Sequence, residues 1–501
     1  MRDAPAKGSL VIRVSGVPGA TDQVLQRLRD GFGGTGRAVP LAGFATLVVV
    51  AGVAATGAAL NLLIPAVGLA GVLLVLLLTV RFPLLPLFVF IVLVPLEEAL
   101  VIGELGTLSR YAALLFVVTY AIPRLGRIKA AAMPVAGWAF LVWAACSAAW
   151  AIDPDEALSE LAVLVLLFTV AVLVADVVVH DPAIVRPALW AYSLSAACVA
   201  VLGVLAYAAE GLSGATRVAA FQGQNVAYFA SIVLPALVFS FYELLRGRLV
   251  PLAAGVALVC TAGVVVSGTR GAWLGAIVVV ALFVLPRLRP RQRIAAVAAV
   301  LAFLVVTLQI PGVAVLVAER ADDSLSSGGA GRTDIWSVGL TIWQTSPVTG
   351  VGLANFPIAY TPTLVQQSNV SVYSTIHTAG RMPHSIVVGT LGELGVIGFV
   401  LLALFFAPLV IRRGWGPEAA AVQAVLASSL VLALFLDVLN RKEVWLVIGL
   451  ACGLSYLARR PVSAVGASTS ARAAAGEPDL VAASGITTSV PSTGHATGRR
   501  S

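Results

Sequence analysis

Residues 383–398 read PHSIVVGTLGELGVIG, and they decide how the chain is organised. A polar stretch of about 70 residues ends here, and a long apolar run begins. His384 and Ser385 stand on the border between the two, and Gly395 and Gly398 follow inside the apolar run. The pattern predicts a membrane helix with a polar, titratable entrance.

The composition is that of a membrane protein. Of the 501 residues, 59% are hydrophobic and 11% are charged, whereas soluble domains carry roughly 25% charged residues. Repeated apolar runs of about 18–22 residues are each long enough to cross ~30 Å of hydrocarbon as a helix. Membrane barrels show short alternating segments instead. The sequence therefore predicts an all-α, polytopic transmembrane helix bundle that has the lipid bilayer, and no nucleic acid, as its partner.

Fourteen apolar runs are candidate membrane spans. Glu97 and Glu98 interrupt one of them, and the next run is short, so we expect about 12–14 spans. The candidate spans lie at 39–59, 62–80, 84–102, 109–123, 131–151, 157–179, 186–208, 225–245, 249–267, 271–286, 293–311, 385–411, 419–437 and 443–458.

Arginine-rich loops alternate with arginine-poor ones, and this asymmetry predicts the orientation. Basic loops stay in the cytoplasm, and the clusters at 124–129, 246–248, 287–293, 412–413 and 459–460 fall on one side. The other side receives 153–156, 217–225, 267–270 and the long polar loop. The parts are therefore a cytoplasmic leader (1–37), an N-terminal transmembrane bundle (38–311), a large extracytoplasmic loop (312–384), C-terminal transmembrane helices (385–458) and a disordered cytoplasmic tail (459–501).

The large loop is expected to contain short helices. Trp336, Leu340 and Trp343 follow one another at i, i+4 and i+7, the spacing of one helical face. The segment opens at Arg332 and ends at Ser346-Pro347. Tryptophan is frequent at the level of lipid headgroups, so we expect this face to lie at the membrane surface.

His384 is the candidate general base. Because Pro383 precedes it, we expect it in the first turn of a membrane helix, where free N–H groups disfavour an imidazolium. A neutral imidazole is what a base needs near pH 7. The alternative is a polar residue that caps the helix. Glu393 would lie ~13 Å deeper along the helix, where we expect it to serve another buried polar group, and glycines at every third residue from Gly389 to Gly398 predict close helix packing.

Two arginines on the outer side are candidate phosphate ligands, Arg270 and Arg332. The guanidinium group offers a fork of donors that fits phosphate well. The alternative is that each side chain extends to lipid headgroups. Arg217 is a weaker candidate, and Arg381 lies three residues from His384.

The segment Asp153-Pro154-Asp155 has the residues of an acidic metal site, but a helix start explains it better. Asp153 fits an N-cap, Pro154 the first helical position and Glu156 the third. No cysteine–histidine cluster has zinc spacing and no Walker-type or dinucleotide loop is present. We therefore expect no metal and no cofactor, and energy from an activated substrate or a gradient.

These motifs together resemble the O-antigen ligase/O-antigen polymerase family of bacterial membrane proteins. The family signature is a histidine followed by Asn, Ser or Gln, nine residues, glycine, two residues and a small residue, Tyr or Thr. His384, Ser385, Gly395 and Gly398 match it in full. Other segments that resemble the family are SGTRGAW ending at Trp273, Gly331–Trp336 with Ser346–Gly352, Trp150–Pro154 and Gln224-Asn225.

The resemblance implies a C-type glycosyltransferase-like fold in the bacterial cytoplasmic (inner) membrane. It implies transfer of a glycan from undecaprenyl diphosphate to a glycan or lipid acceptor at the outer face, without a metal. His384 would be the catalytic base, and the substrate-binding residues would be Arg270, Arg332, Arg217, Asn225 and Ser385. The alternative function is a transporter or flippase of lipid-linked saccharides or small solutes, since such proteins also have many spans and interrupted helices.

Overall fold

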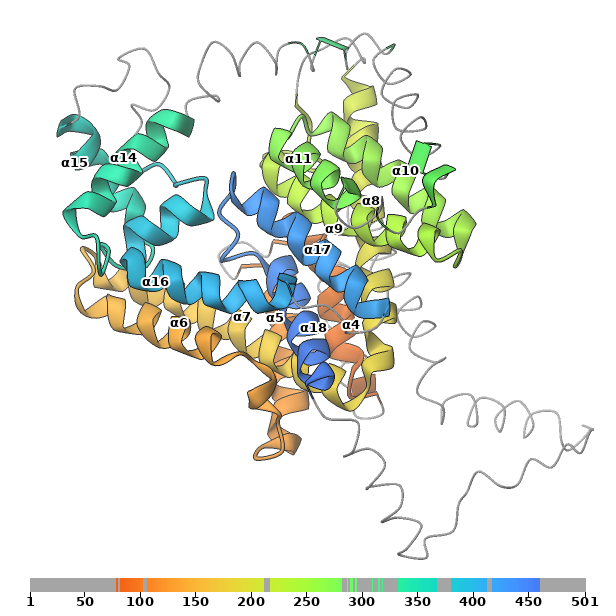
Figure 1. The fold of residues 1–501 in the computed structure, drawn as a ribbon, viewed down its shortest axis with the longest axis horizontal. Helices are drawn as coiled ribbons and strands as arrows, with labels where there is room; N and C mark the ends of the chain where they lie inside the picture. Colours follow the sequence, from red (N-terminus) through yellow and green to blue (C-terminus); the bar gives the residue numbers. More distant parts are fainter. Residues whose placement is uncertain are drawn as a thin grey trace, which may run out of the picture. The chain divides into compact units, whose positions relative to one another are not determined.

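The computed structural model describes residues 82–101, 106–210, 217–281, 332–366, 380–411 and 417–459, with the isolated positions 78–79, 286, 289–291, 293–294, 309, 314–315 and 318 (Figure 1). Met1–Leu457 forms one compact unit, and Ala458–Ser501 forms a second, of which only the first two residues are described. Several predictions lie wholly or almost wholly outside the described residues: the leader 1–37, the spans 39–59, 62–80 and 293–311, and the tail beyond 459.

The regular secondary structure of the described residues is helical, apart from one isolated bridge between Val101 and Thr107. A helix occupies every predicted span that these residues cover, which confirms the all-α fold. The helices are α4 Leu85–Leu93, α5 Leu108–Phe116, α6 Val135–Cys146, α7 Pro154–His180, α8 Val185–Ala209, α9 Val226–Leu245, α10 Val250–Val266, α11 Arg270–Val279, α14 Arg332–Thr345, α15 Phe356–Gln366, α16 Ile386–Ile411, α17 Pro417–Ala433 and α18 Lys442–Ala458.

Four helical segments among the described residues are long and apolar enough to cross a membrane: Pro154–His180, Pro182–Ala209, Val226–Leu245 and Ile386–Ile411. Shorter apolar helices accompany them, at Val135–Ala149, Val250–Val266, Arg270–Val279 and Glu418–Ala433. In hydrocarbon a helix satisfies its backbone polar groups within itself, which is why apolar runs of this length fold as helices. The chain is an all-α membrane protein.

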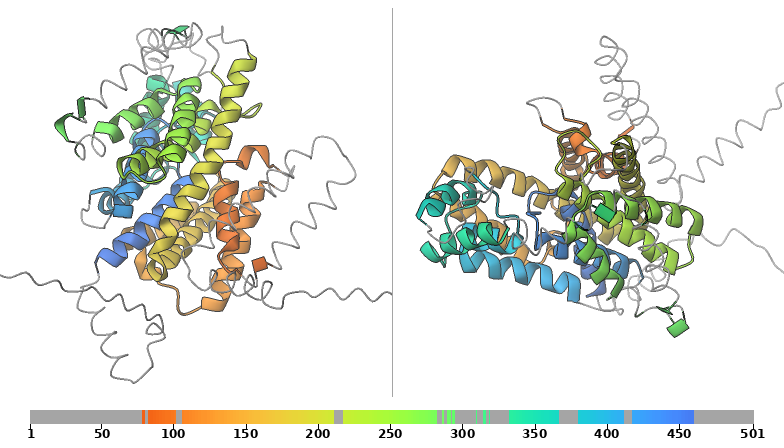
Figure 2. Two further views of the ribbon diagram at one scale, coloured as in Figure 1. Left: turned by 90° about the vertical axis from the view of Figure 1, so that its right-hand side faces the viewer. Right: turned by 90° about the horizontal axis from the view of Figure 1, so that it is seen from above.

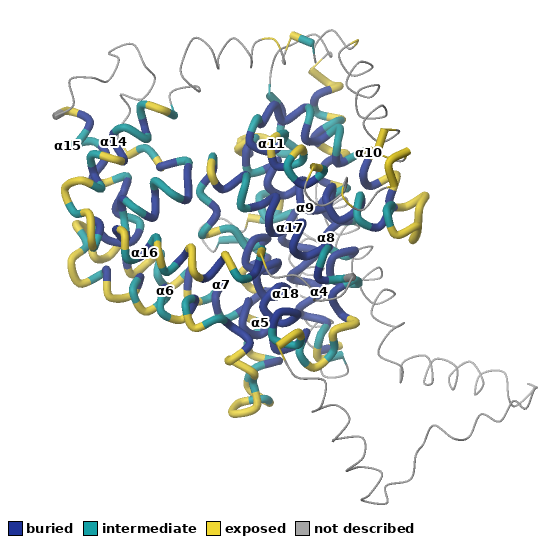
Figure 3. The backbone as a smooth tube through the Cα atoms, in the orientation of Figure 1, coloured by how far each residue is buried: buried dark blue, intermediate teal, exposed yellow. Residues whose placement is uncertain are grey.

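The packing centre is formed by helices that are buried nearly all round. α9 packs against α8, α10 and α17, and Figure 3 shows α18 and α4 dark blue along most of their length. In α18 every residue from Glu443 to Ser455 is buried. A Cβ atom added to Gly449 or Gly453 would lie 2.8 Å from the carbonyl oxygen of Ala171 or Ala175 in α7, respectively. These two glycines therefore let α18 and α7 approach closely.

α14 and α15 pack on each other beside the beginning of α16 (Figures 1 and 2). The prediction of a helix that opens at Arg332 and ends before Ser346 is confirmed. The buried face of α14 carries Ile335, Val338 and Ile342, which form a small core with Phe356, Ala359, Tyr360 and Leu364 of α15. The helical face with Trp336, Leu340 and Trp343 lies beside this core.

Candidate functional site

α16 is broken at the signature glycine. Gly395 has φ +67° and ψ −170° inside the helix, a backbone conformation that is essentially restricted to glycine. The nine residues between Ser385 and Gly395 are therefore one separate half-helix, Ile386–Leu394. The expectation that the regularly spaced glycines serve close packing is confirmed at Gly392, where a Cβ atom would lie 3.0 Å from the Phe356 ring. At Gly395 the approach is closer still, since an added Cβ atom would lie 2.2 Å from Val348 O, but this glycine also breaks the helix.

A segment of the large loop fills the break. It runs from Pro347 to Gly352, and it exchanges backbone hydrogen bonds with both halves of α16. Because irregular backbone inside a membrane protein must find partners within the protein, these bonds are what permits the break. They are Val351 N to Gly392 O (3.0 Å), Gly352 N to Glu393 O (2.8 Å) and Val396 N to Pro347 O (2.9 Å). Trp143 of α6 adds an indole bond to Leu394 O at 2.9 Å.

The residues directly after this segment are tied to the start of α7. Asn355 is fully buried; its amide accepts from Asp153 N at 2.5 Å and donates to Asp153 O at 3.1 Å. The predicted N-cap is confirmed, because the Asp153 carboxylate accepts from the N–H groups of Asp155 and Glu156 and Pro154 is the first helical residue. The acidic segment is thus explained by a helix start and a brace to the large loop.

His384 lies just outside α16, not in its first turn as predicted. The helix begins at Ile386, and Ser385, which is buried, accepts a 3.5 Å bond from Val388 N through its hydroxyl. Serine is among the best N-cap residues, so it takes the position that ends the loop. His384 is left in the left-handed backbone region, with φ +48°, a region in which histidine is enriched but still strained.

The surroundings of His384 favour the neutral imidazole. Burial lowers its pKa below 6.5, and the positive charges of Arg332 and Arg381 lower it further. The predicted direction is confirmed, but the causes are desolvation and neighbouring cations. Among the described residues the imidazole makes no hydrogen bond, so both ring nitrogens stay available to a substrate.

Arg270 and Arg332 lie near each other, although 62 positions separate them in the sequence (332 − 270). Burial lowers the pKa of the Arg332 guanidinium, and the charge of Arg270 lowers it further. Two half-buried cations that lie near each other favour an anionic ligand between them.

Arg217 contacts the turn that carries Arg270, and Asn225 lies at the start of α9. Arg217 donates to Ser267 O at 3.1 Å and to the Thr269 hydroxyl at 3.3 Å, so it holds the turn before α11. Asn225 caps α9 by accepting from Ala227 N at 2.8 Å. The contacts of Arg217 give it a role in placing Arg270, whereas those of Asn225 stabilise the start of α9.

A chain of contacts joins the start of α11 to His384. A Cβ atom on Gly271 would lie 3.2 Å from the Phe435 ring, in the link between α17 and α18. The Phe435 ring faces Trp336 of α14 at 6.3 Å between centroids, and the Trp336 indole donates to Pro383 O at 3.2 Å. Trp336 thus uses its ring and its indole donor inside the protein, and the location of its helical face at the membrane surface stays a prediction.

Glu393 serves another element, as predicted. Its carboxylate accepts from Phe356 N at 3.4 Å, at the first residue of α15. A carboxylate at a helix N-terminus compensates the free N–H groups there. Arg381 is brought beside His384.

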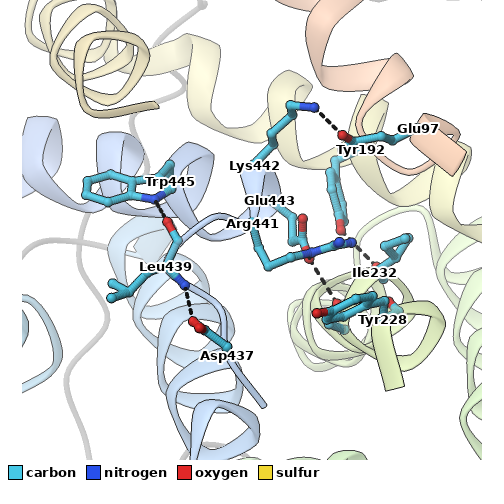
Figure 4. Close-up of polar contacts among 11 residues, drawn as sticks. Glu97, Tyr192, Tyr228, Ile232, Asp437, Leu439, Arg441, Lys442, Glu443 and Trp445 are labelled. Carbon is cyan, nitrogen blue, oxygen red and sulfur yellow. Dashed lines mark hydrogen bonds and ion pairs between the residues drawn. The ribbon is translucent and has the colours of Figure 1, made fainter. Parts of the chain in front are cut away.

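A charged cluster between α17 and α18 has no counterpart in the sequence predictions (Figure 4). Lys442 forms an ion pair with Glu97 and donates to the hydroxyls of Thr107 and Ser109. Arg441 pairs with the buried Glu443 at 3.2 Å and lies over the Tyr228 ring, 4.3 Å from its centroid. The triplet Arg441-Lys442-Glu443 interrupts an apolar region, and charges in such a place are a signal of a built interaction. Here they join the end of α4 and the start of α9 to α18.

Within the described ranges, no group of three or more His, Cys, Asp or Glu side chains is arranged to hold a metal ion. The site consists of cationic and neutral donors around His384, which suits an anionic, hydroxyl-bearing substrate.

Comparison with known families agrees with this arrangement. Residues 254–403 match the family model described as O-antigen ligase. The chain carries a domain of the O-antigen ligase family. The match covers Arg270, Arg332 and His384, as well as the break in α16, and leaves Arg217, Asn225 and the α17–α18 link outside. No curated protein matches the chain. The resemblance drawn from the sequence motifs is confirmed, and O-antigen ligase-like glycan transfer is the general activity that the family supports.

Proposed function

We propose that this protein transfers a glycan from undecaprenyl diphosphate to an acceptor hydroxyl at the outer face of the cytoplasmic membrane, without a metal ion. The observation that carries the proposal is the convergence of Arg270, Arg332 and His384 from three separate elements. Two neighbouring cations and a neutral imidazole are the groups that this transfer requires.

The reaction follows from the roles of these groups. The acceptor oxygen attacks the anomeric carbon of the donor sugar while the bond from that carbon to the diphosphate oxygen breaks. Arg270 and Arg332 stabilise the negative charge that develops on the leaving diphosphate. His384 takes the proton of the acceptor hydroxyl. The diphosphate supplies the activation, so no further energy source is needed.

The break in α16 bears on the alternative of a transporter. In transporters, the freed backbone groups of interrupted helices coordinate the substrate or ion. Here the carbonyl oxygens of Gly392 and Glu393 already accept from Val351 and Gly352. Because the broken backbone is occupied by the protein itself, the interruption supports a rigid catalytic scaffold.

Alanine variants test the roles of the arginines. Arg270→Ala and Arg332→Ala should each bind undecaprenyl diphosphate about 10- to 150-fold more weakly, since charge-assisted hydrogen bonds contribute roughly 1.5–3 kcal/mol. Lysine at either position should restore only part of the loss if two-pronged contacts matter. Arg248→Ala, a half-exposed arginine paired with Glu418, is the matched control. Unchanged binding in both site variants would show that these arginines do not bind the diphosphate and instead extend to lipid headgroups.

His384→Ala tests the base. Transfer of the lipid-linked glycan that accumulates without this protein should fall ~10²–10⁴-fold, while undecaprenyl diphosphate binding changes much less. His180→Ala, at the far end of α7, is the histidine control. Full transfer by His384→Ala would remove the base assignment, and inhibition of the wild type by a chelator would revive a metal-dependent mechanism.

The outer-face assignment has its own test. In a protein whose four cysteines are replaced by alanine, Asp155→Cys should react with an impermeant thiol reagent from outside the cytoplasmic membrane. Arg248→Cys should react only after that membrane is opened. The reverse pattern would invert the topology and remove the proposed site from the outer face.

A further inference from the structure

Trp336 occupies the point where the elements of the site meet. It is half-buried, its ring faces Phe435 of the α17–α18 link, and its indole nitrogen donates to Pro383 O at 3.2 Å. That carbonyl belongs to the peptide bond directly before His384. The Trp336 side chain thus contacts both Phe435, which packs beside Gly271 next to Arg270, and the backbone directly before His384.

The backbone at His384 needs such support. A non-glycine residue in the left-handed region is strained and persists only where its surroundings hold it. On the C-terminal side, Ser385 caps α16 through Val388 N. On the N-terminal side, the bond from Trp336 fixes the carbonyl of Pro383. The two contacts hold the peptide units before and after His384.

On α14, Trp336 lies between Arg332 and a close contact with α16. Arg332 lies one turn before it on the same side of α14. One turn in the other direction, Gly339 approaches α16 so closely that an added Cβ atom would lie 2.4 Å from the Val388 side chain. The beginning of α16 therefore packs directly on α14. The hydrogen bond from the Trp336 indole to Pro383 O holds the backbone before His384 next to this contact.

We propose that Trp336 is a positioning residue, whose indole N–H holds the Pro383 carbonyl so that His384 keeps its left-handed backbone conformation beside Arg332. The proposal rests on the proposed function, in which His384 is the base. It assigns Trp336 no contact with the substrate, and it predicts that the indole donor acts only through His384.

Trp336→Phe and Trp343→Phe form a matched pair. Phenylalanine keeps an aromatic ring but has no N–H donor. Trp343 lies on the same helix and also donates its indole N–H to a carbonyl, Pro347 O at 3.0 Å, but away from His384. Trp336→Phe should lower kcat for glycan transfer roughly 2- to 10-fold, the loss expected for one hydrogen bond. Its affinity for undecaprenyl diphosphate should stay unchanged, and Trp343→Phe should alter neither quantity.

A double variant separates positioning from a general structural effect. In a His384→Ala background, adding Trp336→Phe should not lower the residual rate, because the two changes remove the same function. A further loss of the same size as in the wild type would show that Trp336 acts elsewhere and would overturn the proposal. Equal losses for Trp336→Phe and Trp343→Phe would overturn it as well.

A spectroscopic measurement does not depend on activity. In protein labelled at histidine, the NMR signal of His384 is assigned by its absence in His384→Ala and is titrated with pH. The charged neighbours of His384 are Arg332 on α14 and Arg381 in its own loop. Trp336→Phe should release the imidazole from this environment, so its titration midpoint should rise toward 6.5. An unchanged midpoint would refute the positioning role. Full transfer by His384→Ala, together with a shifted midpoint, would refute the proposed function alone.

Discussion

Replacing Gly395 by alanine should disable the site from a distance. Gly395 breaks α16 with φ +67° and ψ −170°, and an added Cβ atom would lie 2.2 Å from Val348 O and 2.6 Å from Thr349 N. Both neighbours are backbone atoms, so no side chain can rotate away. The docked segment has to move, or the half-helix Ile386–Leu394 has to turn.

The cost follows from two contributions. Holding alanine in a backbone region that glycine alone tolerates costs about 1–3 kcal/mol. Each hydrogen bond between the docked segment and α16 that breaks adds about 0.5–1.5 kcal/mol, and the nearest are those of Val351, Gly352 and Val396. A loss of about 1.5–4.5 kcal/mol is expected if one of these bonds breaks, because the alanine stays strained and relief of the clash displaces the docked segment. Since the segment follows α14 directly, Arg332 and His384 should also lose their mutual placement.

Thermal unfolding of the purified protein in detergent and the rate of glycan transfer measure the two effects. Gly255→Ala is the control, because an added Cβ atom there meets nothing within 4 Å and alanine favours a helix over glycine by roughly 1 kcal/mol. Gly395→Ala should unfold at a clearly lower temperature and transfer slowly, while Gly255→Ala should be as stable as the wild type or more so. A Gly395→Ala protein with wild-type stability and rate would refute the account of the break.

Further changes probe other parts of the structure. Because burial and two arginines lower the pKa of His384, and because only the neutral imidazole accepts a proton, kcat should persist as the pH falls to 6.5 and decline below it; a pH–rate profile that already declines above pH 7 would contradict this. Lys442→Met should destabilise the protein by about 3 kcal/mol in thermal unfolding, since it leaves Glu97 without its cation, and adding Glu97→Gln should recover part of the loss; no recovery would argue against the pair. Asp153→Ala should cost about 1 kcal/mol through loss of the N-cap, with Asp153→Asn close to the wild type as a measured control.

The sequence by itself determined the helices and their ends. Apolar runs of membrane length can satisfy their backbone only as helices, which is why each predicted span within the described residues is helical. The start of α14 at Arg332 and the N-cap at Asp153 are equally local, because they depend on spacing and on side chains that bond to their own neighbours. The candidate base and phosphate ligands could be named for the same reason, because their residue types and their positions beside polar loops can be read from the sequence.

Only the tertiary structure decided how these parts meet. The Trp143 indole reaches Leu394 O across 251 positions and Asn355 reaches Asp153 across 202, and no periodicity encodes such pairs. Gly395 has the same spacing from its neighbours as three helical glycines, yet it breaks the helix because the loop segment 347–352 offers its backbone partners there. The spacing of Trp336 predicts a helical face without saying that Phe435 and the Pro383 carbonyl contact it. The meeting of Arg270, Arg332 and His384 depends on this packing, since each comes from a different element and only contacts between distant segments set the distances that the chemistry needs.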